Sequence, residues 1–558
     1  MVKRILGFFE KEIEGLHEAA YLLAIFAFSS QILALVRDRL LAGTFGASEI
    51  IDVYYASFRI PDLLYVVVTS FISASVLIPY LSKHVNNSEK VQKIIKSLFT
   101  LFLILLIVVS IVILIFTENL LQLFVPEILK GEFASEIVLF TRILLLSPLL
   151  LGVSQLFGSI VQAYRKFFVY AISPLLYNVG IILGIVLFYP IFGPVGLIYG
   201  VVLGLVFHVL IQLPTVAKHK ALPVLTTKID WKLAKEIILT SLPRTLALAS
   251  SQITLLVLIS LASTLAVGSI AIFNFAYNLQ SVPLAIIGVS YSLAAFPTLS
   301  RLFASGENDK FLANLIVSAK HIIFWSFPVI VMFIVLRAQI VRTILGSGSF
   351  DWNDTRLTAA AFAMFAVSVI CQNLILLFLR GYYSAGETRK PLLINLFSTL
   401  VTVISAFVLV NLFNTNYTFQ IFIEELFRIS GIAGSVIIML PMAFSIGMFV
   451  NTILLWFSFE KSFKGFSKSL WCTLVHSLFA SLIGGYVSYG LLQLLDDVFD
   501  LDTLVGIFSQ GFIAGILGLA AWVLVLKLLG NNELEDVWKT MHAKIWKAKP
   551  VVSGQREL

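Results

Sequence analysis

Apolar segments long enough to cross a lipid bilayer recur along this chain, and they constrain its fold more than any other feature. A transmembrane helix needs about 20 mostly apolar residues, and such segments fill most of the sequence between residues 18 and 529. They are continuously apolar rather than alternating, so the strands of a membrane β-barrel are excluded. We expect about fourteen transmembrane helices, at roughly 18–41, 51–81, 95–117, 136–162, 168–189, 192–216, 234–263, 267–302, 312–336, 357–384, 391–412, 429–457, 469–495 and 503–529.

The composition agrees with a chain that lies mostly in lipid. Of its 558 residues, 59% are hydrophobic and only 13% are charged, whereas about a quarter of the residues in a soluble domain are charged. The sequence therefore predicts an all-α integral membrane protein. Its net charge of +8 does not indicate nucleic-acid binding, because the basic residues stand in short loops. Cys371 and Cys472 both fall in apolar runs, which predicts neither a disulfide framework nor a metal site.

The distribution of charge between the loops sets the expected orientation. Lys and Arg gather in the loops after the even-numbered spans and in both terminal segments, while most other loops are neutral or acidic. The loop after the ninth span is an exception, since it holds Arg337, Arg342 and Arg356. Because cytoplasmic loops carry the excess of positive residues, we expect both termini in the cytoplasm.

Matching stretches of sequence indicate an internal repeat. "SVLIPYLSKH" ends the second span and "LAAFPTLSRL" ends the eighth, while "SIVQAYRKFFVYAISP" and "RGYYSAGETRKPLLIN" close the fourth and the tenth. A six-helix unit that occurs twice predicts two lobes with pseudo-twofold symmetry about the membrane normal and a cavity between them. We expect a cytoplasmic amphipathic N-terminal segment (1–17), an N-lobe (18–220) and a C-lobe (221–465). Two additional helices (466–530) and a basic cytoplasmic tail (531–558) are expected to follow.

The first two spans carry charged residues that are costly in lipid. Arg59 lies on the order of 12 Å into the second span, and a central charge costs roughly 2.5–3.5 kcal/mol. Asp52 is two helical turns before Arg59, and Asp62 is three residues after it, so both can share its face. An arginine that faces a polar cavity suits a phosphate group, because its fork donates two parallel hydrogen bonds. We interpret Arg59 as the main contact for an anionic headgroup and Asp52 as the neighbour that tunes it.

Arg37 and Asp38, near the outer end of the first span, are predicted to line or gate the outer part of the cavity. A structural alternative stays open for these charges, because a salt bridge that pins the first two spans together would need the same residues. Arg39 is interpreted as an interfacial anchor at the helix end.

The order "RD…FGA…D…Y…FRIP…LL" from residue 37 onwards resembles the opening of the MurJ (MviN) family, which are lipid II flippases of the multidrug/oligosaccharidyl-lipid/polysaccharide exporter superfamily. Later pieces follow in the family's order, among them "LPRTLALASSQI", "NLQSVPLAIIGVSYSLAAFPTLSRL" and "YYSAGETRKPLLINL". The resemblance implies two six-helix lobes around a central cavity and two extra helices with a lipid-binding groove. It also implies that undecaprenyl-pyrophosphate-linked disaccharide-pentapeptide moves to the outer leaflet by alternating access, driven by membrane potential or an ion gradient.

The chain departs from the family pattern at several positions. Gln31 stands where the family usually has an arginine, Tyr65 replaces a basic residue, and Asn278 replaces the arginine of the eighth helix. Neutral hydrogen bonds from such residues are about half as strong as charge-assisted ones. We include Gln31 and Asn278 in the expected substrate site. The charged residues that it retains are Arg37, Asp38, Asp52 and Arg59.

Catalytic and nucleotide-binding patterns are not found in the sequence. It has no Ser-His-Asp order, no HExxH, no CxxC and no GxxxxGK[ST] loop, so we expect no enzyme, no metal site and no cofactor apart from a coupling ion, a proton or sodium. The favoured hypothesis is a flippase for the lipid-linked peptidoglycan precursor in the bacterial inner membrane, with membrane lipids and cell-wall synthesis proteins as partners. The alternatives are an exporter of another polyprenyl-linked glycan or a small molecule, and a membrane scaffold that does not transport.

Overall fold

The computed structural model describes residues 16–69, 88–164, 166–219, 222, 224–226 and 231–546. Within these ranges the secondary structure is helical and contains no strand, which confirms the all-α prediction. Ten helices in the described ranges are long and apolar enough to cross a membrane, or twelve if each of two bent helix pairs is one span. The figure of about fourteen stays a prediction, because part of the second expected span lies outside the described residues.

Several sequence predictions concern residues whose placement is not described. They are most of the N-terminal segment (1–15), the end of the second expected span with the "SVLIPYLSKH" repeat motif (70–87), and the end of the basic tail (547–558).

The chain separates into two compact units by its internal contacts. Unit 1 contains Met1–Val282, Val341–Ser368 and Glu387–Asn451, and unit 2 contains Pro283–Ile340, Val369–Gly386 and Thr452–Leu558. The lobe boundaries expected at residues 220 and 465 stay predictions.

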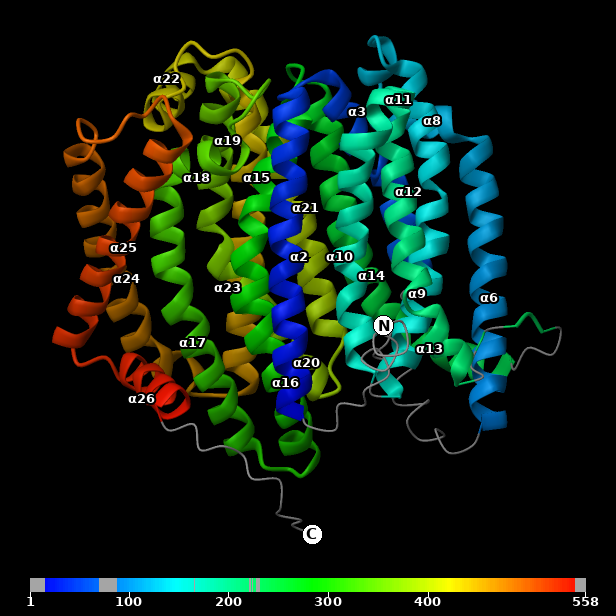
Figure 1. Ribbon diagram of the computed structural model, residues 1–558. Helices are drawn as coiled ribbons and strands as arrows, with labels where there is room; N and C mark the ends of the chain where they lie inside the picture. Colours follow the sequence, from blue (N-terminus) through cyan, green and yellow to red (C-terminus); the bar gives the residue numbers. More distant parts are fainter. Residues whose placement is uncertain are drawn as a thin grey trace. The chain divides into compact units, whose positions relative to one another are not determined.

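Unit 1 is a bundle in which α10 packs against α2 and α12, while α14 packs against α4 and α21 (Figure 1). Its helices are α2 (Leu16–Phe45), α3 (Glu49–Ser57), α4 (Arg59–Thr69), α6 (Ser88–Ile115), α7 (Thr117–Phe124), α8 (Ala134–Leu144), α9 (Leu146–Ala163), α10 (Phe167–Leu183), α11 (Tyr189–Phe192), α12 (Val195–Leu210), α13 (Leu213–Lys218), α14 (Trp231–Ser263), α15 (Ser269–Pro283), α19 (Trp352–Val367), α21 (Arg389–Thr415) and α22 (Tyr417–Phe427). The 3-10 turns are η2 (Ile128–Lys130) and η5 (Ser435–Ile438), and η3 (Gly184–Phe188) is a π-turn. Three helices have residues in both units: α15, whose last residue Pro283 belongs to unit 2, α18 (Arg337–Leu345) and α23 (Met439–Ser462).

Glycines four residues apart allow α10 and the π-turn η3 that follows it to approach α12 closely. A Cβ atom on Gly180 would lie 2.2 Å from the backbone of Gly204, and one on Gly184 would lie 2.6 Å from the backbone of Gly200. Small residues at this spacing let membrane helices pack backbone to backbone, where van der Waals contact replaces the hydrophobic driving force of water. This contact fixes α10, which carries part of the candidate site.

Large apolar side chains fill the rest of the unit 1 core. Leu64 and Val68 of α4 pack with Phe102 and Leu106 of α6 and with Phe157 of α9, and all five are less than a twentieth exposed. Close packing of this kind holds α4 against its neighbours, because each lost methylene in a core is costly.

Unit 2 is built around α17, which packs against α24, α20 and α16. Its helices are α16 (Ser290–Ala304), α17 (Asn308–Val335), α20 (Val369–Ser384), α24 (Phe466–Leu494), α25 (Leu504–Leu528) and α26 (Asn532–Trp546), with the π-turn η4 (Leu284–Val289) before α16. The pair α24 and α25 again meets at small residues, since a Cβ on Gly484 would lie 2.7 Å from the Gly518 carbonyl oxygen. Phe324 and Trp522 fill the apolar contact between α17 and α25.

A buried carboxylate ties α26 to the helices of unit 2. The side chain of Glu533 accepts hydrogen bonds from the Thr473 hydroxyl at 2.8 Å and from the Asn531 amide at 2.8 Å. It also pairs with the Lys320 ammonium at 3.2 Å. Each carboxylate oxygen therefore has a partner, and Glu533 holds the start of α26 against α17 and α24.

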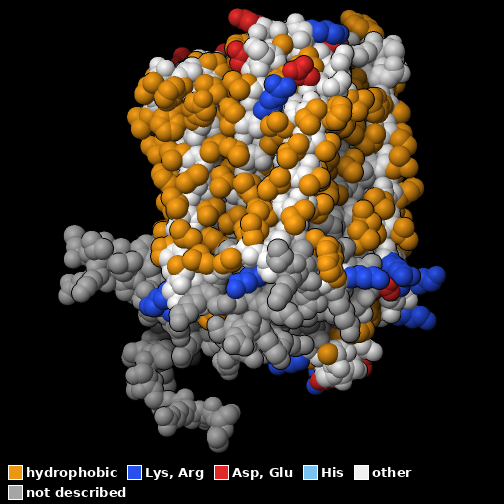
Figure 2. Space-filling view, turned by 90° about the vertical axis from the view of Figure 1, so that its right-hand side faces the viewer, with side chains coloured by type: hydrophobic (Ala, Val, Ile, Leu, Met, Phe, Trp, Pro, Cys, Tyr) orange, Lys and Arg blue, Asp and Glu red, His pale blue; other side chains and the backbone are white. Residues whose placement is uncertain are grey.

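The outer surface of the helices suits lipid. Figure 2 shows one face of the molecule on which hydrophobic side chains form a broad band, with Lys and Arg side chains at its edge. In α6, exposed apolar residues recur along the helix, among them Ile104, Val108, Ile111 and Ile115. Such a surface agrees with a chain that has many apolar helices, because lipid tails cover it at no desolvation cost.

Candidate functional site

Unit 1 contains a partly open polar cavity of about 250 Å³. It lies among α2, α3, α4, α10 and α15, and its wall is polar although the surrounding helices are apolar. The residues that line it are Arg37, Tyr54, Tyr55, Phe58, Arg59, Asp62, Tyr177, Ile181, Asn274, Tyr277 and Asn278. Ionisable side chains inside a membrane protein mark functional sites by default, because they are expensive to bury.

A break in the second span places Arg59 on the cavity wall. Helix α3 ends at Ser57, Phe58 forms a turn, and α4 begins at Arg59. Pro61 has no N–H to donate to the Ser57 carbonyl, so a continuous helix through this point would lack a hydrogen bond. Irregular backbone at this depth is tolerated where it borders a cavity rather than lipid.

Each of the three guanidinium nitrogens of Arg37 donates a hydrogen bond to a neighbouring side chain. Its Nε and Nη2 atoms donate to one oxygen of Asp38 at 2.9 and 2.8 Å, and its Nη1 atom donates to the Asn178 amide oxygen at 3.2 Å. The Asp38 side chain is only 3% exposed, so this ion pair is largely shielded from water. The pairing offsets the cost of burying both charges.

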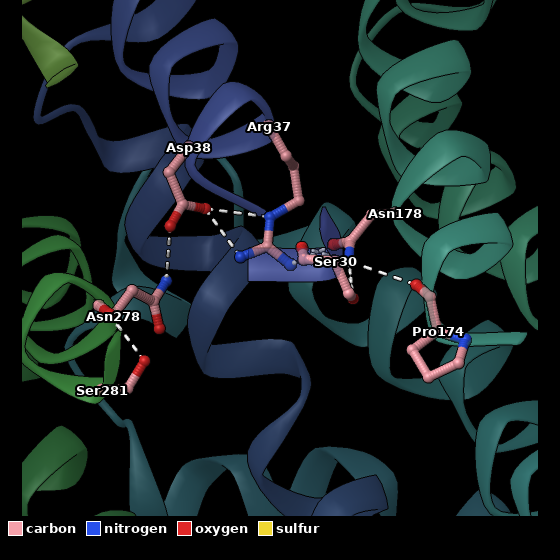
Figure 3. Close-up of polar contacts among 7 residues, drawn as sticks. All are labelled: Ser30, Arg37, Asp38, Pro174, Asn178, Asn278 and Ser281. Carbon is pink, nitrogen blue, oxygen red and sulfur yellow. Dashed lines mark hydrogen bonds and ion pairs between the residues drawn. The ribbon is translucent and has the colours of Figure 1, made fainter. Parts of the chain in front are cut away.

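The Arg37–Asp38 pair is held from both sides by asparagines (Figure 3). Asn278 of α15 donates to the second oxygen of Asp38 at 3.0 Å, and Asn178 of α10 donates to the Ser30 hydroxyl of α2 at 3.3 Å. Helices α15, α2 and α10 are thereby joined through one chain of polar contacts. Asn278 thus contacts Asp38 and lines the cavity, and its role in substrate binding stays a prediction.

Arg59 is oriented but not saturated. Its Nη2 atom donates to the Asn274 amide oxygen at 2.5 Å, and Asn274 is itself fixed by donating to the Ile270 carbonyl at 2.8 Å. The Nε atom of Arg59 and the hydroxyl of Tyr55 are buried and have no hydrogen-bond partner among the described residues. Buried donors of this kind are rare in proteins, so the cavity offers hydrogen bonds to a polar ligand.

Asp52 has a different role from the one that its spacing predicted. Its two carboxylate oxygens accept hydrogen bonds from the backbone N–H groups of Gly268 and Ala271, both at 2.7 Å. Asp52 therefore caps the start of α15 and is not among the cavity-lining residues. Its place in the substrate site stays a prediction, but the contact with Arg59 that the spacing suggested is not made, since the two side chains share no hydrogen bond or ion pair in the described part of the chain. The physical reason is that free N–H groups at a helix start attract a carboxylate strongly.

Two further charged or polar positions were singled out in the first span. Gln31 is partly buried on α2 and does not line the cavity, and its place in the substrate site stays a prediction. Arg39 donates to the backbone carbonyls of Thr343 and Ile344 at 2.6 and 3.2 Å. It is therefore tied to the end of α18 by specific hydrogen bonds, which adds to its interpretation as an anchor.

Several residues of the site were not anticipated from the sequence. Among them are Asn178, which orients Arg37, and Asn274, which lines the cavity and orients Arg59. The lining residues Tyr54, Tyr55, Phe58, Tyr177 and Ile181 were not singled out either. The available signal was an amide inside an apolar run, as in "LLYNVG" and "AIFNFAYN". In the described residues, no group of three or more His, Cys, Asp or Glu side chains is arranged to hold a metal ion.

Residues 41–508 match the protein family described as "Lipid II flippase MurJ". Among curated relatives, the probable lipid II flippase MurJ of Borreliella burgdorferi is 27% identical over 395 residues, which cover 69% of this chain and 76% of that protein. The probable lipid II flippase MurJ of Buchnera aphidicola is 24% identical over 526 residues, covering 91% of this chain and 96% of that protein.

Solved structures show the same fold. A lipid II flippase MurJ in an inward closed conformation superposes with a TM-score of 0.71 at 22% identity, covering 91% of this chain and 99% of that one. An inward-facing multidrug resistance transporter of the MATE family superposes with a TM-score of 0.64 at 15% identity, covering 80% of this chain and 99% of that one.

Proposed function

Because this chain belongs to the MurJ family of lipid II flippases, we propose that it moves the lipid-linked peptidoglycan precursor from the inner to the outer leaflet of the bacterial inner membrane. The cargo is an undecaprenyl-pyrophosphate-linked glycopeptide whose headgroup enters the cavity of unit 1. Both termini lie in the cytoplasm, and alternating access is driven by membrane potential or by a proton or sodium gradient.

The observation that carries this proposal is the incomplete hydrogen bonding of the Arg59 guanidinium. Its guanidinium lines the cavity, is oriented by Asn274, and keeps a buried Nε–H without a partner among the described residues. A guanidinium fork binds phosphate oxygens through two parallel, charge-assisted hydrogen bonds. In the proposal Arg59 therefore grips the pyrophosphate, while Arg37 stays paired with Asp38 and shapes the outer wall.

The remaining wall suits the uncharged part of such a headgroup. Asn278 supplies an amide at the edge of the cavity, and Tyr55, Tyr177 and Tyr277 supply rings and hydroxyls. Aromatic rings with polar tips bind amphipathic groups well, because one side of the group stays apolar and the other is hydrogen-bonded. Sugar rings and peptide groups have this character.

The test is complementation of a strain in which its own flippase is depleted. Arg59→Ala should abolish rescue of growth while the variant still accumulates in the membrane. Arg142→Ala is the matched control, because Arg142 is exposed and pairs with Glu118 away from the cavity. Full rescue by Arg59→Ala would overturn the assigned role of Arg59.

Mass spectrometry of the lipids that copurify with the protein identifies the cargo directly. We expect polyprenyl-diphosphate glycopeptides with the wild type and much less of them with Arg59→Ala. A different polyprenyl-linked glycan would favour an exporter of that glycan, and a stable complex with cell-wall synthesis proteins without transport would favour a scaffold.

A further inference from the structure

Asp62 is an acidic side chain that faces the same cavity as Arg59. It lies in the first turn of α4, three residues after Arg59, and belongs to the cavity wall. The described part of the chain gives its carboxylate no hydrogen bond and no ion pair within 4.0 Å. Its interaction with the guanidinium of Arg59 is through space, by charge alone.

The position of Asp62 near the start of α4 does not by itself explain why this residue is an acid rather than a neutral polar residue. A carboxylate in the first turn gains from the positive end of the helix, typically by about 0.3–1 kcal/mol. Polar neutral residues such as Asn and Ser are equally favoured near helix starts. A carboxylate that faces a cavity intended for an anion has a cost that such a neutral residue would not have.

The charges of the cavity are balanced rather than positive. Arg37 is neutralised by its close ion pair with Asp38. The remaining cation among the lining residues is Arg59, and Asp62 is the acid beside it. Like charges brought together at a binding site cost several kcal/mol, and the penalty grows as the dielectric constant of the surroundings falls.

We propose that Asp62 is a specificity-determining residue that limits how much negative charge the cavity accepts at Arg59. The inference rests on the proposed function and names the class of headgroup: an amphiphile with a short acidic linkage whose uncharged glycan or peptide part supplies a large share of the binding. Each further negative charge on the linkage meets the Asp62 carboxylate as well as the guanidinium. Moderate affinity also favours release on the other side of the membrane, since a cargo that binds too tightly is not released.

The test uses the purified full-length protein in detergent and three probes of one chain length. The probes are farnesol, farnesyl phosphate and farnesyl diphosphate, whose negative charge increases in that order, and binding is measured with EDTA and again with Mg²⁺. Asp62→Asn removes the charge at constant shape. We expect Asp62→Asn to raise the binding affinity for farnesyl diphosphate about tenfold and for farnesyl phosphate about threefold, and to leave the affinity for farnesol unchanged.

Three further variants separate charge from shape and from folding. Asp62→Glu keeps the charge and should resemble the wild type. Asp62→Ser is a second neutral variant and should follow Asp62→Asn. Glu136→Gln removes a half-buried acid that does not line the cavity and should leave all three affinities unchanged.

The outcomes distinguish this inference from the proposed function. If no farnesyl probe binds the wild type or any variant, the inference fails, because Asp62 then acts on no bound diphosphate; the proposed function is decided separately by the complementation experiment. If the probes bind the wild type and Asp62→Asn equally, only the inference fails. It is also overturned if diphosphate binding requires Mg²⁺ and is lost in Asp62→Asn, because Asp62 would then be a ligand of a metal ion carried by the diphosphate.

Discussion

Asp62 in unit 1 and Glu533 in unit 2 are both acids partly or wholly withdrawn from water, but their surroundings are opposite. Glu533 is 6% exposed, and its two oxygens are bound by Thr473, Asn531 and Lys320. Asp62 lines a cavity and receives no hydrogen bond within the described residues. A saturated buried acid holds helices in place, whereas an unsaturated one at a cavity is available to a ligand.

Glu533→Ala should give the largest loss of stability, about 3 kcal/mol, because hydrogen bonds to a charged acceptor contribute about 1.5–3 kcal/mol each and partners stay behind unpaired. Thermal unfolding in detergent measures it as a midpoint lowered by several degrees. Glu535→Ala is the control on the same helix, since Glu535 is exposed and pairs with Lys539. Equal midpoints for the two variants would contradict the anchoring role of Glu533.

Asp52 combines features of both acids. It is close in sequence to the cavity residue Arg59, but both of its carboxylate oxygens accept hydrogen bonds, as those of Glu533 do. Asp52→Ala should lose about 2 kcal/mol, in the range of a strong helix cap, and Asp52→Asn about half of that, since one acceptor oxygen remains. Unfolding midpoints together with headgroup binding check this. A large loss of affinity at unchanged stability would instead place Asp52 among the binding residues.

The stability that Glu533 contributes should depend on pH. Burial alone would raise the pKa of Glu533, but hydrogen bonds from Thr473 and Lys320 outweigh burial and lower the pKa below its ordinary value of 4.5. The contribution is therefore complete above pH 4.5 and is lost as the pH falls through the lower pKa of the folded protein. The difference in unfolding midpoint between the wild type and Glu533→Ala should shrink on acidification. A difference that stayed constant down to strongly acidic pH would show that the charge of Glu533 is unimportant.

Asn274→Ala should have the smallest effect of these variants, and it should lower binding affinity rather than stability. Asn274 orients Arg59 through its amide oxygen, so its loss should weaken farnesyl diphosphate binding about fivefold, the equivalent of roughly 1 kcal/mol. Stability should change little, because Arg59 can turn toward the cavity. Asn411→Ala, at an exposed position of α21, is the control. Loss of stability without loss of affinity would make Asn274 a structural residue like Glu533.

Site residues could be predicted from the sequence where the residue type and its immediate neighbours were sufficient evidence. Arg59 and the Arg37–Asp38 pair could be selected because charges inside apolar runs are conspicuous and costly. Asn278 was found through resemblance to the family. Asn178 and Asn274 were missed, although they too interrupt apolar runs, because neutral amides in helices are common and their partners lie 141 and 215 residues away in the chain.

Asp52 illustrates why the correct spacing can still predict the wrong partner. Two helical turns do place it on the same side as Arg59 in an unbroken helix. The helix is interrupted at Phe58, however, and the start of α15 presents backbone N–H groups to the Asp52 carboxylate. Periodicity describes one helix, while the partner is supplied by another.

The sequence by itself determined that this protein is an all-α membrane protein of the MurJ family, where its apolar segments lie, and which cations need an explanation. Hydropathy and the cost of a buried charge are properties of each segment alone. Only the tertiary structure decided which acids are saturated and which remain open at the cavity, because hydrogen-bond partners depend on which helix faces meet. That depends on packing between segments far apart in the chain.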